Sequence, residues 1–165
     1  MIDFLSKHIE RALDAHLYYL AVICTLMLPD ICSALESEDG QTQREKYKAW
    51  CDTWFLDSYP NLTRDDLYSL RCGVVHQGKL GHQNMQYSRI VFTLPVSDKT
   101  SIHNNVVNDA LNLDAVTFCR DMIDAVSRWY IQNKNGTWVK ANLPRLIRLY
   151  PKGLPPYITG VPVIS

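Results

Sequence analysis

The sequence predicts a mainly α-helical protein, a helical bundle with one small inserted β-hairpin. Apolar residues recur at steps of three or four over long stretches of the chain, which is the spacing of one helix face. Short β-branched and aromatic runs, typical of strands, lie within residues 88–107. A chain of 165 residues is long enough to bury its own core, and no repeat or linker divides it.

The first half of the chain is expected to form four helices. One apolar stripe from Ile2 to Met27 predicts a single long helix, which Pro29 ends. Asp30 is expected to cap a short second helix. Thr63 opens a stretch that resembles a capping box, and Gly78 follows it as a left-handed stop. The four helices are therefore predicted over residues 2–27, 31–36, 42–55 and 63–76.

The second half is expected to contain the hairpin and two more helices. Strands over residues 88–94 and 102–107 are predicted to pair as a hairpin. Asp114 is expected to cap a long helix, and Pro144 suits the first turn of a last one. Four Pro and two Gly exclude a helix from the tail, residues 151–165. The apolar side chains of this tail predict that it packs on the bundle, so that residues 1–165 form one domain.

Composition excludes several classes of protein. Lys and Arg total 17 and Asp and Glu total 17, so no net charge attracts polyanions to the whole surface. Five cysteines without a Cys-x-x-Cys pair are typical of a reducing compartment. The N-terminal segment is too charged for a signal peptide, and the most apolar run, residues 17–29, is shorter than the roughly 20 residues of a membrane span. We therefore expect a cytoplasmic protein with no membrane partner, no metal and no cofactor.

The charges are distributed unevenly along the chain. Residues 30–66 carry nine acids against four bases, whereas residues 67–97 contain no Asp or Glu. The acid-free segment carries Arg71, Lys79, Arg89 and two histidines. This arrangement predicts the local positive patch that RNA or a nucleotide requires. The alternative is a solvated loop that carries a few bases.

Arg71 and His76 form an Arg-x4-His pair at the end of the fourth predicted helix. In this motif, and in its setting within an all-α bundle, the chain resembles the HEPN superfamily, whose ribonucleases carry such a pair on one helix. The chain as a whole also resembles a family of uncharacterised bacterial and prophage-borne proteins, in residues 28–32, 103–105 and 160–165. The second resemblance implies no function.

The HEPN resemblance implies metal-independent cleavage of RNA by a protein of the toxin or phage-defence kind. It does not identify a cognate antitoxin. His76 would transfer protons, because histidine titrates near neutrality. Arg71 would hold two non-bridging phosphate oxygens with its guanidinium. Lys79, His82 and His103 are the candidate substrate-binding residues around this pair.

Helix geometry predicts that one chain assembles this pair poorly. Residues five apart are separated by about 140° around a helix axis and by about 7.5 Å along it. A two-fold homodimer would place two Arg-His pairs around one cleft, as the HEPN resemblance also implies. Gly73 lies inside the motif, where the missing side chain lets another helix approach closely, from the partner or from the same chain.

Other interpretations of the motif stay open. Cys72 stands where the family often has a small polar residue after the arginine, so a catalytically inactive HEPN-like module that binds nucleotide, RNA or a protein is the alternative function. A purely structural dimer is a third. A basic pair in the last turns of a helix also complements the helix dipole. Cys72 and His76 share one helix face, as a Cys-His nucleophile or half a metal site would.

Overall fold

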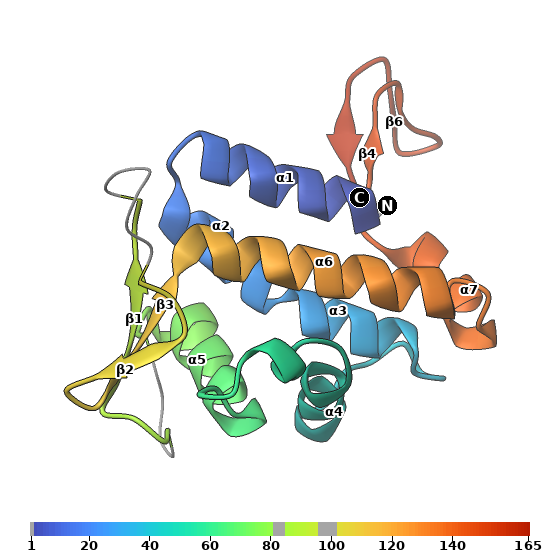
Figure 1. Cartoon of the computed structure of the whole chain (residues 1–165). Coiled ribbons are helices and arrows are strands. Elements are labelled where there is room, and N and C mark those ends of the chain that lie inside the picture. Colours follow the sequence, from blue (N-terminus) through green and yellow to red (C-terminus); the bar gives the residue numbers. More distant parts are fainter. Residues whose placement is uncertain (1, 81–84, 96–101) are drawn as a thin grey trace.

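The computed structural model describes residues 2–80, 85–95 and 102–165 (Figure 1). The helices are α1 (Ile2–Asp14), α2 (Tyr18–Leu26), α3 (Leu28–Leu35), α4 (Arg44–Trp54), α5 (Arg64–Gln77), α6 (Ala115–Asn133) and α7 (Thr137–Asn142), with the 3-10 turns η1 (Leu56–Ser58) and η2 (Leu143–Arg145). The strands are β1 (Arg89–Thr93), β2 (Asn105–Val107), β3 (Ala110–Asp114), β4 (Leu149–Tyr150), β5 (Gly153–Leu154), β6 (Ile158–Thr159) and β7 (Val163–Ile164). The predicted mainly α-helical class is confirmed.

Helix α6 is the centre of the molecule and contacts α1, α2, α3, α4 and β3. Its start was predicted correctly, because the Asp114 carboxylate accepts the backbone N–H of Thr117 at 2.8 Å and so satisfies a free helix donor. The side chains of Phe118, Met122 and Trp129 are completely buried along its length. The hydrophobic core is therefore built around α6, on which helices α1 to α4 pack.

The predicted single helix from Ile2 to Met27 is wrong. Helix α1 ends at Asp14, His16 has a left-handed φ of 58°, and the chain turns before α2 begins. This turn lets α1 pack against both α2 and α6, which a straight helix of that length does not allow. Pro29 does not end a helix but lies in the first turn of α3, where its missing N–H costs nothing.

The predicted hairpin between residues 88–94 and 102–107 is also wrong, although strands β1 and β2 lie in these segments. Strand β3 lies between them, parallel to β1 and antiparallel to β2. The hairpin is instead formed by β2 and β3, joined through Asn108 and Asp109, which both have positive φ as tight hairpin turns require. Strand β3 takes the central place because Leu111 and Leu113 are completely buried.

The C-terminal segment differs from the expectation at two points. The last predicted helix is only the turn η2, with Pro144 in its first positions. In the tail, β4 pairs with β7 and β5 pairs with β6, so backbone hydrogen bonds are satisfied locally. The side chains of Tyr157 and Ile164 are 84% and 62% exposed. Packing of these tail side chains on the bundle is therefore not what the structure shows.

One described segment, residues 18–35, is long and apolar enough to cross a membrane by length and composition alone. It comprises α2 and α3, with Met27 between them. Half of it is buried inside the fold, and core helices of soluble proteins meet the same criterion. A span of this kind near the N-terminus is weak evidence for a membrane location.

Replacing Asp66 tests the start of α5. The buried Asp66 carboxylate accepts the backbone N–H groups of Thr63 and Gln86 at 3.1 and 2.7 Å. The Asp66→Ala substitution removes half of the capping box and leaves two partly buried backbone N–H groups without their acceptor, so we expect the free energy of unfolding to fall by about 2–4 kcal/mol. Urea denaturation measures it, with the exposed Glu38→Ala as control. Equal stability of the two variants would contradict this role.

Candidate functional site

Local signals in the sequence fix the helix that carries the motif. Thr63 and Asp66 form a capping box at the start of α5, and Gly78 closes its end with a left-handed φ of 64°. The predicted boundaries, Thr63 to His76 with Gly78 as the stop, are thus confirmed to within one residue. Helix α5 packs against α4 and α2. Arg71 and His76 therefore lie in the C-terminal half of a well-anchored helix.

Arg71 and His76 meet within one chain. Nη1 of Arg71 lies 3.0 Å from Nε2 of His76. Because a guanidinium can only donate, Nε2 accepts and the imidazole is the neutral Nδ1–H tautomer in this arrangement. The expectation that one chain leaves the pair apart is therefore wrong. The angular separation applies to the backbone, and the long arginine side chain spans it.

Asp30 holds the arginine from another helix. Nε of Arg71 donates to Oδ2 of Asp30 at 2.7 Å, and the two side chains are only 20% and 14% exposed. Asp30 lies in the first turn of α3, but it does not cap this helix as expected, because the N-cap is Met27. Asp30 belongs to the acid-rich segment, so the positive patch expected around Arg71 is partly neutralised by this ion pair.

The two partners of this ion pair are affected differently by burial. Burial raises the pKa of Asp30, and the hydrogen bond and charge of Arg71 offset this only in part. Burial by itself lowers the pKa of Arg71. The hydrogen bond and the charge of Asp30 raise this pKa and outweigh the effect of burial, so that it ends above its ordinary value. Because arginine stays charged at any working pH, the electrostatic cost of the pair lies on Asp30.

Cys72 takes part in the same cluster. Nη1 of Arg71 lies 3.9 Å from its sulfur. Burial and a hydrogen bond to Cys72 together raise the pKa of Tyr68, one turn earlier on α5. Among the described residues, no contact joins Cys72 to His76, so the structure gives a Cys-His nucleophile no support. The hydrogen bonds of Arg71 to described residues are made by Nε and Nη1, and among these residues none accepts a hydrogen bond from Nη2.

The other predicted site residues lie elsewhere or outside the described segments. Lys79 is exposed just beyond α5, where its backbone N–H donates to the Gly73 carbonyl at 3.1 Å. His82 lies outside the described residues. Nδ1 of His103 accepts the backbone N–H of Asp114 at 3.1 Å, and its ring packs edge-on against Tyr59.

His103 is therefore part of the fold and not of this cluster. The side chain of the neighbouring Asn104 donates to the carbonyl of Ser58 at 3.2 Å, and Ser58 precedes the start of α5 in the chain. His76 lies near the opposite end of α5. This helix has 14 residues and is therefore about 20 Å long. Asp30, which sequence reasoning assigned to a cap, is the residue that the structure adds to the site.

No protein-family model, no curated protein and no solved structure matches this chain. Within the described segments, no group of three or more His, Cys, Asp or Glu side chains is placed to hold a metal ion. The candidate site is therefore described from its side chains alone. It consists of the exposed imidazole of His76, the half-buried guanidinium of Arg71 and the carboxylate of Asp30 that holds this guanidinium.

The Asp30→Asn variant tests the cost of burying Asp30. The native state binds the Asp30 proton more tightly than the unfolded chain, because its pKa is raised from the ordinary 3.8. Ionisation therefore destabilises the native state as pH rises through the raised pKa. We expect the unfolding free energy of the wild type, minus that of Asp30→Asn, to fall over this range. Urea titrations at several pH values measure it, and a difference that grows with pH would refute the assignment.

Proposed function

We propose that this chain is a metal-independent endoribonuclease of the toxin or phage-defence kind, a HEPN-like protein that acts in the cytoplasm as a homodimer. The observation that carries the proposal is the exposed His76 imidazole, 3.0 Å from a guanidinium that Asp30 orients. Cleavage of a phosphodiester by its own ribose needs a proton-transfer group beside a cation that binds the phosphate oxygens. The cluster supplies both.

The proposed reaction starts with attack of the ribose 2′-hydroxyl on the adjacent phosphorus. The products are a 2′,3′-cyclic phosphate and the free 5′-hydroxyl of the next nucleotide. The incoming phosphate displaces Nε2 of His76 from Nη1 of Arg71, so that Nε2 can take the 2′-hydroxyl proton. Nη1 and Nη2 of Arg71 then bind the non-bridging oxygens while Asp30 keeps Nε. His76 of a second copy donates the proton that the leaving 5′-oxygen needs.

Support for the homodimer comes from exposed apolar side chains beside the end of α5. Tyr19, Leu80 and Leu94 border a small apolar pocket of about 160 Å³, and each is 45–59% exposed. Exposed apolar surface is typical of interaction sites. The two arguments drawn from sequence carry less weight, because Gly73 is buried within its own chain and the Arg-His pair forms without a partner.

The catalytic prediction concerns His76 and Arg71. Purified protein should cut RNA in EDTA and leave 2′,3′-cyclic phosphate ends. We expect His76→Ala to lower the rate by about 10²- to 10⁴-fold and Arg71→Ala by about 10²- to 10³-fold. Arg71→Lys should restore little, because an ammonium cannot bind two oxygens side by side. Single-turnover cleavage of labelled RNA measures these rates.

The matched control for this experiment is His8→Ala. His8 is an exposed histidine on α1 whose only described hydrogen bond is to the Phe4 carbonyl, so its loss should leave the rate unchanged. A 2′-deoxy sugar at the cut site should abolish cleavage and preserve binding. Full activity of His76→Ala, or no cleavage of any RNA by the wild type, would reject the enzyme.

The assembly prediction concerns the apolar surface at the end of α5. We expect Leu80→Lys to convert a dimer to a monomer, because a charge replaces an apolar contact there. Ile131→Lys is the control, since Ile131 is 67% exposed on α6 and lies outside this surface. Light scattering at micromolar concentration gives the mass of each variant. A wild-type protein that is a monomer under these conditions would rule out the two-fold mechanism.

The second candidate function is an inactive module that binds RNA, nucleotide or a protein partner. The ion pair with Asp30 favours it, because a guanidinium already neutralised attracts phosphate less strongly. Under this alternative, wild type cuts no RNA, while Arg71→Ala weakens RNA binding and reduces its dependence on salt.

A further inference from the structure

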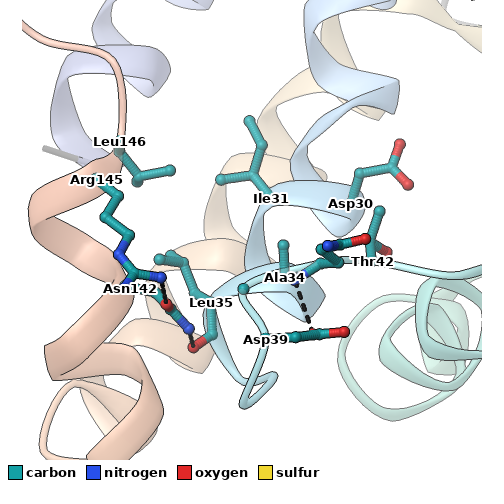
Figure 2. Close-up of a pocket in the computed structure, with 11 residues that line it drawn as sticks. Asp30, Ile31, Ala34, Leu35, Asp39, Thr42, Asn142, Arg145 and Leu146 are labelled. Carbon is teal, nitrogen blue, oxygen red and sulfur yellow. Dashed lines mark hydrogen bonds between the residues drawn. The ribbon is translucent and has the colours of Figure 1, made fainter.

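A pocket of about 450 Å³ lies next to the Asp30–Arg71 ion pair. Helix α3, the loop that follows it and the turn η2 form its walls. In Figure 2, Arg145 and Leu146 lie on one side and Asp39 and Thr42 on the other, with Ile31 and Ala34 between them. Asp30 borders the same pocket. The pocket thus has an apolar floor and polar groups at opposite edges, and its volume is typical of sites for small organic molecules.

The structure holds the two sides of this pocket together. The buried Asn142 side chain donates to the carbonyls of Leu35 and Ser37 at 3.3 and 2.7 Å. These bonds tie α7 to the end of α3. A Cβ at Gly40 would lie only 3.0 Å from Oδ1 of Asn142, so the loop approaches the end of α7 closely. The pocket is therefore part of the folded framework.

The polar groups at the edges have unused hydrogen-bonding capacity. The Arg145 guanidinium donates to Oδ1 of Asn142 at 3.3 Å, and it forms no ion pair with any described residue. Oδ1 of Asp39 accepts the backbone N–H of Gln41 and lies 3.8 Å from Nζ of Lys46. In the described part of the chain, Oδ2 of Asp39 and Oδ1 of Asp30 accept no hydrogen bond. Donors are thus free at one edge and acceptors at the other.

We propose that this pocket binds a guanine base of the RNA substrate, an inference that rests on the proposed ribonuclease function. Guanine presents two adjacent acceptors, O6 and N7, which an arginine binds together. Its other edge presents the N1–H and N2–H donors, which suit carboxylates. A planar ring between these edges covers the apolar floor of Ile31, Ala34 and Leu146.

The charges of the pocket favour a base over a phosphate. Arg145 lines the pocket together with Asp30 and Asp39, and these two carboxylates already pair with Arg71 and Lys46. A phosphate inside would therefore meet one guanidinium beside carboxylate oxygens, and not the cluster of cations that a phosphate site needs. The neutral base can occupy the pocket while its phosphate stays with Arg71. Asp30 joins the two places, because it lines the pocket and also binds Arg71 at 2.7 Å. With the guanine base in the pocket and its phosphate at Arg71, the RNA is expected to be cut next to a guanine.

The first experiment changes the ligand and leaves the protein intact. Isothermal titration compares guanosine with inosine, which lacks the 2-amino group, and with 7-deazaguanosine, which lacks N7. We expect each loss to weaken binding by at least about fivefold. Adenosine, cytidine and uridine should bind at least as weakly as these analogues. Equal affinity for the four natural nucleosides, or no guanosine binding at millimolar concentration, would overturn the proposal.

The second experiment assigns each edge of the base to a residue. Arg145→Gln should remove the difference between guanosine and 7-deazaguanosine, and Asp39→Asn should reduce the difference between guanosine and inosine. Lys140→Ala is the matched control, because Lys140 is exposed on the neighbouring α7 and does not line the pocket. Circular dichroism melts confirm that the variants fold. Differences that persist in full in both variants would also overturn the proposal.

Binding to His76→Ala separates this inference from the ribonuclease itself. His76 is required for the proposed cleavage and is not a lining residue, so this variant should bind guanosine as the wild type does. Guanosine binding without cleavage of any RNA would reject the enzyme and retain the pocket. Cleavage without guanosine binding and without preference for guanine at the cut would reject the pocket and retain the enzyme.

Discussion

The ion pair between Asp30 and Arg71 connects α3 to α5 and determines the shape of the site. A carboxylate as buried as Asp30 is costly to ionise by itself, and the guanidinium 2.7 Å away reduces this cost. The same bond fixes the direction of the arginine side chain. With Nε held by Asp30, Nη1 reaches His76, although the two residues start on different faces of the helix. A contact between residues 41 positions apart thus organises a motif that spans six.

The parts of the fold that were predictable from sequence are those that local chemistry decides. The capping box of Thr63 and the left-handed Gly78 fix the ends of α5, and Asp114 fixes the start of α6. Such signals act within one helical turn. The turn at His16 and the central place of β3 depend on packing between distant segments. Periodicity gives the buried face of a segment, but it does not say where the chain folds back or which strand it pairs with.

The site was predictable in the same partial way. Spacing identified Arg71 and His76, whereas the role of Asp30 was missed. A signal was present, because Asp30 is the only charged residue in the apolar stretch from 17 to 35. A lone acid among core residues requires a cation, but the sequence does not say which of 17 lysines and arginines supplies it. His103 was selected for its polarity, and the fold uses that polarity in its contact with Asp114.

The charge state of this cluster bears on how a phosphate can enter it. Asp30 ionised, Arg71 charged and His76 neutral sum to no net charge, so the resting cluster attracts a phosphodiester weakly. Under the proposed ribonuclease function, an added proton would strengthen phosphate binding, because the cluster would then carry a net positive charge. Burial already raises the pKa of Asp30, and a nearby phosphate raises it further by repulsion. In the proposed mechanism, a proton on His76 of the second copy would instead go to the leaving 5′-oxygen. In the proposed ribonuclease, proton uptake and phosphate binding would therefore be linked, since each would make the other more favourable.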